Sequence, residues 1–209
     1  MKKLVTLLFL AVFSQQLLAG NAELIAETAE KVTPLMNGQN IPHTTLKDVE
    51  GNTVSLKQIV SQKPTVIVFY RGGWCPYCSN QLAGLREIEE KVLKLGYQLV
   101  AISPDSPERL QAQKVENDYK ITLLSDANFD VTSQFGIGFF LPEKTADKYR
   151  DKLGVEFVAL DGTSKVALPV PAVYVVDKEG MVHFNYVNPN FRVRLSPELL
   201  YQATKTLAL

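Results

Sequence analysis

The stretch that decides the fold is Thr65-Val-Ile-Val-Phe-Tyr-Arg-Gly-Gly-Trp-Cys-Pro-Tyr-Cys78. Its first part, 65–70, is a continuous run of apolar and β-branched residues, which is typical of a strand buried on both faces. Two glycines end the run and the cysteines follow at once, with Pro76 suited to the first turn of a helix. The sequence therefore predicts a buried strand that leads directly into a cysteine pair at the start of a helix.

The position of the cysteine pair predicts a redox-active dithiol. Unpaired N–H groups and the dipole at a helix N-terminus favour negative charge, so they lower the pKa of a thiol placed there. We therefore expect Cys75 to be the nucleophile and Cys78, one helical turn further on, to be its partner. Arg71 would add positive charge at the same place.

Three structural interpretations of the pair fit less well. A disulfide between cysteines so close in sequence closes a very small loop, so it removes little entropy from the unfolded chain. A structural zinc site takes about four ligands, whereas the rest of the chain offers no further cysteine and only His43 and His183. Two unrelated buried thiols are not expected beside Trp74 and Pro76 at a strand-to-helix turn.

The rest of the chain alternates predicted strands and helices. Two short strands in 41–56 form an N-terminal hairpin, and apolar residues recur at helical spacing in 81–95. Further helices are expected at 22–32, from Ser106 with Pro107 in the first turn, at 128–135, at 143–152 and from Ser196. Further strands are expected at 98–102, 121–124, 172–176 and 182–187, the last two joined by a turn at 177–180. This order predicts an α/β protein with a central mixed β-sheet flanked by helices on both faces.

Composition and charge narrow the class of protein. The 209 residues suit one domain, the 22 acidic and 22 basic residues cancel, and no basic tract favours nucleic acid. Lys2 and Lys3 precede the apolar run 4–13, and small residues follow, which predicts a signal peptide over 1–22. We expect a periplasmic or secreted protein with no stable membrane insertion after cleavage; the alternative is an uncleaved N-terminal anchor facing the periplasm.

Several segments resemble the alkyl hydroperoxide reductase and thiol-specific antioxidant (AhpC/TSA) family, peroxiredoxin-like proteins of the thioredoxin-like superfamily. They are the Trp74–Cys78 motif, Ala101–Glu108, Ile121–Asp126 with Val131–Gly136 after it, and Pro171–Gly180. Together, and in the same order as in the family, these segments extend the resemblance from about residue 37 to residue 207. The resemblance implies one thioredoxin-like domain over 37–207.

The family resemblance also implies a reaction. Cys75 would be the peroxidatic cysteine, whose thiolate attacks a hydrogen peroxide or organic hydroperoxide and becomes a sulfenic acid. Cys78 would condense with it to a disulfide, and a thioredoxin-like dithiol protein would reduce that disulfide. No cofactor is implied.

The chain departs from typical peroxiredoxins at two positions. Where they carry a threonine before the reactive cysteine and an arginine on the late strand, this chain has Gly72 and Pro171. The charge of Arg71 and the N–H groups of Gly72, Gly73, Trp74 and Cys75 would have to bind the peroxide instead. Thioredoxins have a cis-proline at the late position, so we expect a cis bond between Val170 and Pro171.

Two other functions therefore stay open. A thiol–disulfide oxidoreductase would use Pro171 to dock the backbone of a partner protein and Cys75 to exchange with its disulfide. A copper chaperone would hold the metal with both cysteines and His183.

The remaining polar residues near the motifs are expected to be structural. Asp105 and Asp126 should cap the helices or turns that follow them. Trp74 should pack over the dithiol, and Arg192 and Arg194 should lie on the surface.

Overall fold

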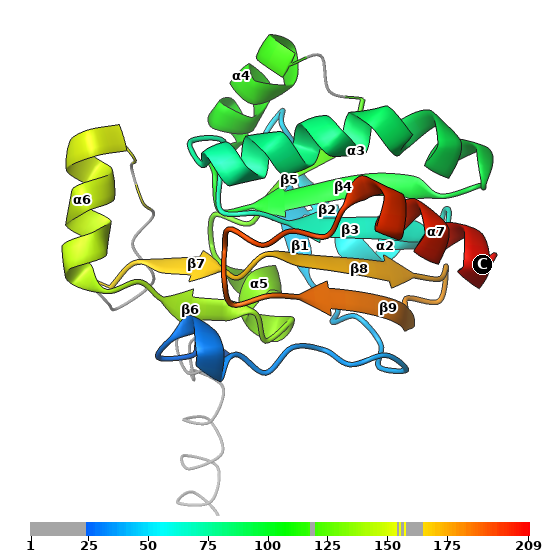
Figure 1. Ribbon diagram of the computed structural model, residues 1–209, viewed down its shortest axis with the longest axis horizontal. Coiled ribbons are helices and arrows are strands. Elements are labelled where there is room, and N and C mark those ends of the chain that lie inside the picture. The colour runs from blue at the N-terminus through cyan, green and yellow to red at the C-terminus, as the bar shows by residue number, and fades with distance from the viewer. Residues whose placement is uncertain (1–23, 118–119, 154, 156, 158–164) are drawn as a thin grey trace, which may run out of the picture.

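The computed structural model describes residues 24–117, 120–153, 155, 157 and 165–209 (Figure 1). Seven strands form the main sheet in the order β2-β1-β5-β4-β3-β8-β9. Their bounds are β1 Thr45–Lys47, β2 Thr53–Ser55, β3 Thr65–Phe69, β4 Gln98–Ser103, β5 Thr122–Ser125, β8 Ala172–Val176 and β9 Val182–Val187. The predicted signal peptide, 1–22, lies outside the described residues.

The sheet is mixed, as the sequence predicts. Strands β3, β4 and β5 run parallel, while β8 pairs antiparallel with β3, and β1 pairs antiparallel with β5. The β1–β2 hairpin confirms the expected N-terminal hairpin, and the β8–β9 hairpin confirms the expected pair near the end of the chain. The α/β class and the thioredoxin-like arrangement are therefore confirmed.

The central strand supplies side chains to both faces of the sheet. All five residues of β3 are buried. Because successive side chains point to opposite faces, Val66 and Val68 join one core cluster, and Ile67 and Phe69 join the other. The continuous apolar run thus forms the strand buried on both faces that the sequence predicts.

Helices cover both faces of the sheet. One face carries α3 (Pro76–Lys94), α4 (Pro107–Asn117) and α7 (Pro197–Leu207), with α3 and α7 side by side in Figure 1. The other face carries α2 (Leu56–Val60) and α5 (Asp130–Gln134). The buried carboxylate of Asp126 accepts from the backbone N–H groups of Val131 and Thr132, 3.0 and 2.7 Å away, so its predicted capping role is confirmed.

The described residues of segment 136–168, whose role the sequence does not indicate, form a separate unit beside the main sheet. It contains the small sheet of β6 (Gly138–Phe140) and β7 (Ala167–Pro169) and the helix α6 (Glu143–Leu153). Figure 1 shows α6 beyond the end of the main sheet from which α3 starts. The unit therefore stands next to the cysteine motif.

The expected helix at 22–32 is wrong for the residues that the structure describes. Only a short 3-10 turn, Ala29–Lys31, forms there. Ala26 instead pairs as an isolated bridge with Phe139: its N–H donates to the Gly138 carbonyl and its carbonyl accepts from Phe140. This extended pairing to β6 satisfies backbone groups that a helix would have bonded internally.

Within the described part of the chain, no helix is both long enough and apolar enough to cross a membrane.

Candidate active site

The loop between β3 and α3 follows a path that requires glycine at position 72. Gly72 has a φ of +135°, a value that residues with a side chain rarely adopt. A Cβ atom there would lie 2.4 Å from Trp74 Nε1 and 2.8 Å from Asp105 Oδ1. Both the backbone angle and the lack of space therefore exclude a larger residue unless the loop moves.

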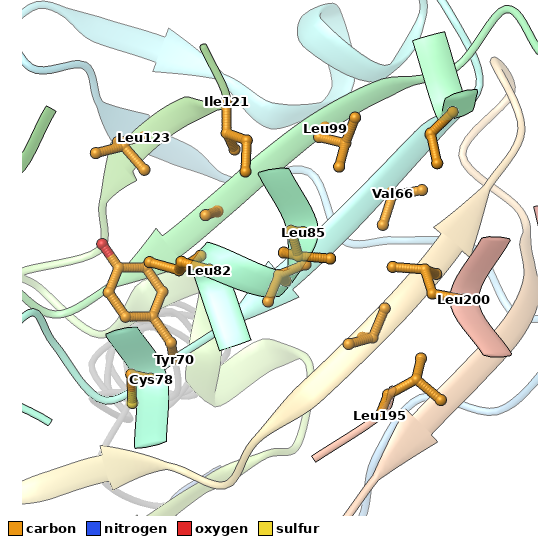
Figure 2. Packing of buried hydrophobic residues seen from close by; sticks show 14 of the residues in the cluster. Val66, Tyr70, Cys78, Leu82, Leu85, Leu99, Ile121, Leu123, Leu195 and Leu200 are labelled. Carbon is orange, nitrogen blue, oxygen red and sulfur yellow. The ribbon is translucent and has the colours of Figure 1, made fainter. Parts of the chain in front are cut away.

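Cys75 lies at the N-terminal cap of α3, as the sequence predicts. Its backbone is extended, Pro76 occupies the first turn, and its carbonyl accepts from the N–H groups of Cys78 and Ser79, at 2.9 and 3.1 Å. Both cysteines are free thiols, and their residues are only 2% and 1% exposed. Figure 2 shows Cys78 beside Tyr70 and Leu82 at one side of the core cluster.

The two thiols differ strongly in acidity. The pKa of Cys75 is lowered to about 6, mainly by a hydrogen bond with the Cys78 thiol and also by the charges of Arg71 and Arg194, against the opposing effect of burial. Burial raises the pKa of Cys78, and the neighbouring Cys75 raises it more, while Arg194 opposes both. At neutral pH, Cys75 is therefore the thiolate and Cys78 the protonated partner.

Arg71 is a buried cation in an aromatic cage. Its residue is 2% exposed, and its guanidinium carbon lies 4.5 Å from the ring centre of Phe191 and 5.3 Å from those of Trp74 and Tyr149. Nη2 donates to the Tyr149 hydroxyl at 3.3 Å, and Nε has no hydrogen-bond partner among the described residues. Because no carboxylate of the described chain pairs with it, its charge acts on the Cys75 thiolate.

Arg194 lies against the second thiol, not on the open surface that the sequence predicts for it. Its Nη2 is 3.3 Å from Cys78 Sγ, Nη1 donates to Gln81 Oε1 at 2.7 Å, and Nε donates to the Phe191 carbonyl at 2.8 Å. No local pattern marks this residue, because the β9–α7 connection brings it to α3 only in the folded chain. Arg192, by contrast, is exposed as expected.

Asp105 holds the cysteine loop, and the expectation that it caps the following helix is wrong. Its Oδ2 accepts from the Gly73 N–H at 2.8 Å and from Gln113 Nε2 at 3.2 Å. Ser106 is the residue that caps α4, since its Oγ accepts from the Arg109 N–H. Burial raises the pKa of Asp105, and the Gly73 hydrogen bond partly offsets that effect.

Aromatic residues of the α6 unit cover one side of the cysteine motif. The Trp74 ring centre lies 5.2 Å from that of Tyr149 and 6.1 Å from that of Phe157. Trp74 also packs against the cluster that contains both cysteines. The expected shielding by Trp74 is thus present, and segment 136–168 helps to shape the site.

The sequence of the chain matches a known family over most of the domain. The model of the AhpC/TSA family matches residues 37–185. The chain belongs to the AhpC/TSA family.

Curated relatives of this AhpC/TSA protein carry peroxiredoxin names. It is 33% identical over 151 residues to the chloroplastic peroxiredoxin Q of Populus jackii, covering 72% of this chain but only 60% of the relative. The chloroplastic peroxiredoxin Q of Sedum lineare is 34% identical over 151 residues, 72% of this chain and 68% of the relative. Peroxiredoxin Bcp of Escherichia coli K12 is 33% identical over 106 residues, 51% of this chain and 67% of that protein.

Solved structures share the fold at lower identity. Peroxidoxin BcpB from Mycobacterium tuberculosis superposes with a TM-score of 0.63 at 18% identity, covering 83% of this chain and 96% of that one. Reduced Prx3 from Vibrio vulnificus, in complex with hydrogen peroxide, gives 0.64 at 17% identity, covering 82% and 96%.

The family departure at position 72 has a structural cause. A threonine like that of typical peroxiredoxins does not fit this path of the loop, because its Cβ would collide with Trp74 and Asp105. Of the N–H groups expected to bind peroxide in its place, that of Gly73 donates to Asp105, and that of Cys75 donates to the Gly72 carbonyl at 3.2 Å. Arg71 and the N–H groups of Gly72 and Trp74 remain candidates to orient a peroxide, and their role in substrate binding stays a prediction.

The predicted cis bond between Val170 and Pro171 is wrong: the described residues contain no cis peptide bond. This family member runs extended from β7 into β8, with the Val170 N–H donating to the Ile137 carbonyl and the Pro171 carbonyl accepting from Asn188. The trans chain path keeps both hydrogen bonds. Pro171 precedes Ala172, the partner of Phe69, so it lies at the end of the sheet where the cysteine loop begins; its role in substrate binding stays a prediction.

His183, the third ligand in the copper-chaperone alternative, interacts with Asp177. His183 Nε2 lies 2.7 Å from Asp177 Oδ2 across the β8–β9 hairpin. This interaction lowers the pKa of Asp177 against the opposing effect of burial. No group of three or more His, Cys, Asp or Glu residues suited to a metal occurs among the described residues.

Proposed function

We propose that this protein is a thiol-dependent peroxidase that reduces hydrogen peroxide or organic hydroperoxides. The Cys75 thiolate attacks the terminal oxygen of the hydroperoxide and breaks the O–O bond. Cys75 becomes a sulfenic acid, and water or an alcohol leaves after taking up a proton. Family membership and the peroxiredoxin names of the relatives support this reaction.

One observation carries the proposal: Cys75 is a low-pKa thiolate at a helix start beside a buried guanidinium that no carboxylate of the described chain pairs with. The pKa of about 6 keeps the nucleophile ionised at neutral pH. Arg71 has no carboxylate partner in the described chain, so its charge is available to a polarised peroxide oxygen. The aromatic cage keeps bulk water from this charge, which strengthens its effect.

We further propose that Cys78 resolves the sulfenic acid. Cys78 lies within hydrogen-bonding contact of Cys75, so the two sulfurs need little movement to join. The resulting disulfide would be reduced by a thioredoxin-like dithiol protein, which supplies the two electrons used in the cycle.

We also propose that the protein acts outside the cytoplasm, in the periplasm or after secretion. The support is the sequence of residues 1–22, with its charged start, short apolar run and small residues. Mass spectrometry of the N-terminus of the exported protein tests this location.

Stopped-flow fluorescence tests the peroxidase reaction directly, because Trp74 is the only tryptophan and packs against the cysteine cluster. Reduced protein is mixed with hydrogen peroxide or cumene hydroperoxide under pseudo-first-order conditions. We expect a second-order rate at least about a hundredfold above that of free glutathione, since a positioned thiolate gains from orientation and charge.

Two cysteine variants serve as matched controls. Cys75→Ser should abolish the fluorescence change, whereas Cys78→Ser should still react once and accumulate a sulfenic acid that dimedone traps. Oxidation of the wild type no faster than glutathione, together with rapid exchange with a protein disulfide, would contradict the peroxidase and favour the oxidoreductase alternative.

A further inference from the structure

A second guanidinium, that of Arg194, lies against the Cys78 thiol, whereas the charge of Arg71 acts on Cys75. Its Nη2 contacts Cys78 Sγ at 3.3 Å. The other two contacts of the group, to Gln81 Oε1 and to the Phe191 carbonyl, hold it from both sides. The fork of donors therefore has a fixed orientation toward the sulfur.

The loop that carries Arg194 is anchored against α3. In the β9–α7 connection, the Val193 N–H donates to the Asn190 carbonyl at 2.9 Å, and Ser196 caps α7 through the Leu199 N–H at 3.2 Å. Helix α7 approaches α3 so closely that a Cβ at Gly84 would lie 2.8 Å from Pro197 Cγ. The packing of α7 on α3 thus keeps the connection that carries Arg194 close to the helix that carries Cys78.

The charge of Arg194 has no anionic partner in the described chain. Its hydrogen bonds within the described chain go to an amide oxygen, a backbone carbonyl and a sulfur, all of which are neutral when Cys78 is a thiol. Cys78 itself is 1% exposed, so burial opposes its ionisation. Among the atoms of the described chain that accept a hydrogen bond from Arg194, the Cys78 sulfur is therefore the one that can become negatively charged.

We propose that Arg194 is a catalytic residue of the resolving step, in which it stabilises the developing thiolate of Cys78. The proposal rests on the proposed peroxidase function. In this step the Cys78 sulfur attacks the Cys75 sulfenic sulfur, the S–S bond forms and the S–O bond breaks. The hydroxide that leaves takes the proton lost by Cys78 and departs as water, so no further reactant is needed.

The two arginines thereby act on different steps. The charge of Arg71 favours the Cys75 thiolate more than that of Arg194 does, whereas Arg194 contacts Cys78 directly. Removal of Arg194 should thus change peroxide attack little and slow disulfide formation strongly.

The test is rapid-quench oxidation of the reduced full chain by one equivalent of hydrogen peroxide. Dimedone traps the sulfenic acid, and intact mass separates it from the disulfide. In Arg194→Gln, we expect the sulfenic acid to live roughly tenfold longer or more, the effect of one lost hydrogen bond to a charged group. The rate of peroxide attack should stay within about threefold of wild type, since the charge acts on Cys75 only at a distance.

The matched control is Arg192→Gln, which removes the same charge two positions away from an exposed side chain. Its sulfenic-acid lifetime should equal that of the wild type. Arg194→Lys keeps the positive charge but lacks the several N–H donors of the guanidinium, so it should give an intermediate sulfenic-acid lifetime. The same variant replaces Arg194→Gln in the test if Arg194→Gln does not fold.

A second measurement does not depend on peroxide. In a Cys75→Ser background, thiolate absorbance should show that Cys78 titrates at higher pH once Arg194→Gln is added. If the wild type forms no sulfenic acid, the proposed peroxidase and this resolving role both fail. If it does form one, and the lifetimes and the titration are unchanged in Arg194→Gln, only the role of Arg194 is overturned.

Discussion

The carboxylate of Asp105 accepts a hydrogen bond from the backbone N–H of Gly73, with 2.8 Å between the two atoms. The same oxygen accepts from Gln113, whose own side-chain oxygen accepts from the Tyr70 hydroxyl at 3.1 Å. The end of β4 is thereby tied to the loop that presents Cys75. The hydrogen bond that this backbone N–H donates to a buried carboxylate fixes the loop on which the nucleophile depends.

We therefore predict that Asp105→Ala slows peroxide oxidation of Cys75 by about tenfold, because a loosened loop misplaces the nucleophile. Asp105→Asn should keep most of the rate, since one amide oxygen can accept from both Gly73 and Gln113. Stopped-flow fluorescence measures both variants. Equal rates for Asp105→Ala and wild type would show that the loop keeps its shape without the carboxylate.

The acidity of Cys75 predicts a pH profile. The reactive form is the deprotonated one, so the second-order rate with hydrogen peroxide should rise with pH, pass its midpoint near pH 6 and reach a plateau above it. Thiolate absorbance of Cys78→Ser should titrate over the same range, although loss of the Cys78 hydrogen bond should raise its midpoint. In Cys75→Ser, burial should still hold the pKa of the remaining Cys78 thiol above its ordinary value. A lower midpoint in Cys75→Ser than in Cys78→Ser would reverse the assignment of the nucleophile.

Removal of the buried positive charge of Arg71 should lower the rate of peroxide oxidation without lowering the stability of the fold. Arg71→Met keeps a long apolar side chain among Trp74, Tyr149 and Phe191 but removes the charge. We expect the rate of peroxide oxidation to fall at least about tenfold and the Cys75 pKa to rise. The free energy of unfolding in urea should stay within about 1 kcal/mol of wild type or increase, because a buried charge without a counterion is replaced by apolar surface. A large loss of stability with unchanged chemistry would mean that Arg71 is purely structural.

Replacing Gly72 by the threonine that typical peroxiredoxins carry should destabilise the fold. Gly72→Thr combines a φ of +135° with a Cβ 2.4 Å from Trp74 Nε1, so we expect it to destabilise the fold by about 3 kcal/mol or more. Gly96→Ala is the matched control, since φ there is +92° and nothing lies within 4 Å of the added Cβ. That variant should lose only about 1 kcal/mol. Similar urea midpoints for the two variants would show that the cysteine loop shifts easily.

The buried cap Asp126 predicts a pH dependence of stability. Burial raises its folded-state pKa to about 6, above the 3.8 of an unperturbed carboxyl. The stability that this group adds through protonation is thus fully present below pH 3.8 and is lost as the pH rises through 6. Between these values, the free energy of unfolding of the wild type should fall with pH relative to that of Asp126→Asn, which does not titrate there. Parallel pH profiles of the two proteins would contradict the raised pKa.

Local patterns in the sequence determine where the reactive cysteine Cys75 lies in the fold. The apolar run of β3, the glycines after it and Pro76 at the first helical turn together place Cys75 at the N-terminus of α3. Each of these signals acts over a few residues, through burial, backbone freedom or a fixed φ, so each can be read without the rest of the fold. The same holds for the Asp177–Gly180 turn and for the N-terminal hairpin.

The failures of sequence-based prediction share a different cause. The expected helix at 22–32 gives way to a bridge with β6, and the expected cis bond before Pro171 gives way to an extended path bonded to Ile137 and Asn188. In both places, distant segments supply hydrogen-bond partners that outweigh the local preference. Neither partner can be identified from the neighbouring residues.

The reactive pair can be recognised from the sequence alone, because the strand, the turn and the helix start are encoded within one short stretch. The surroundings of that pair arise only on folding: the hydrogen bond from Gly73 to Asp105, the packing of Tyr149 against Trp74 and the guanidinium of Arg194 at Cys78. These surroundings depend on the fold because charge and burial act through space. The groups that set the chemistry of two adjacent thiols therefore come from parts of the chain that meet only after folding.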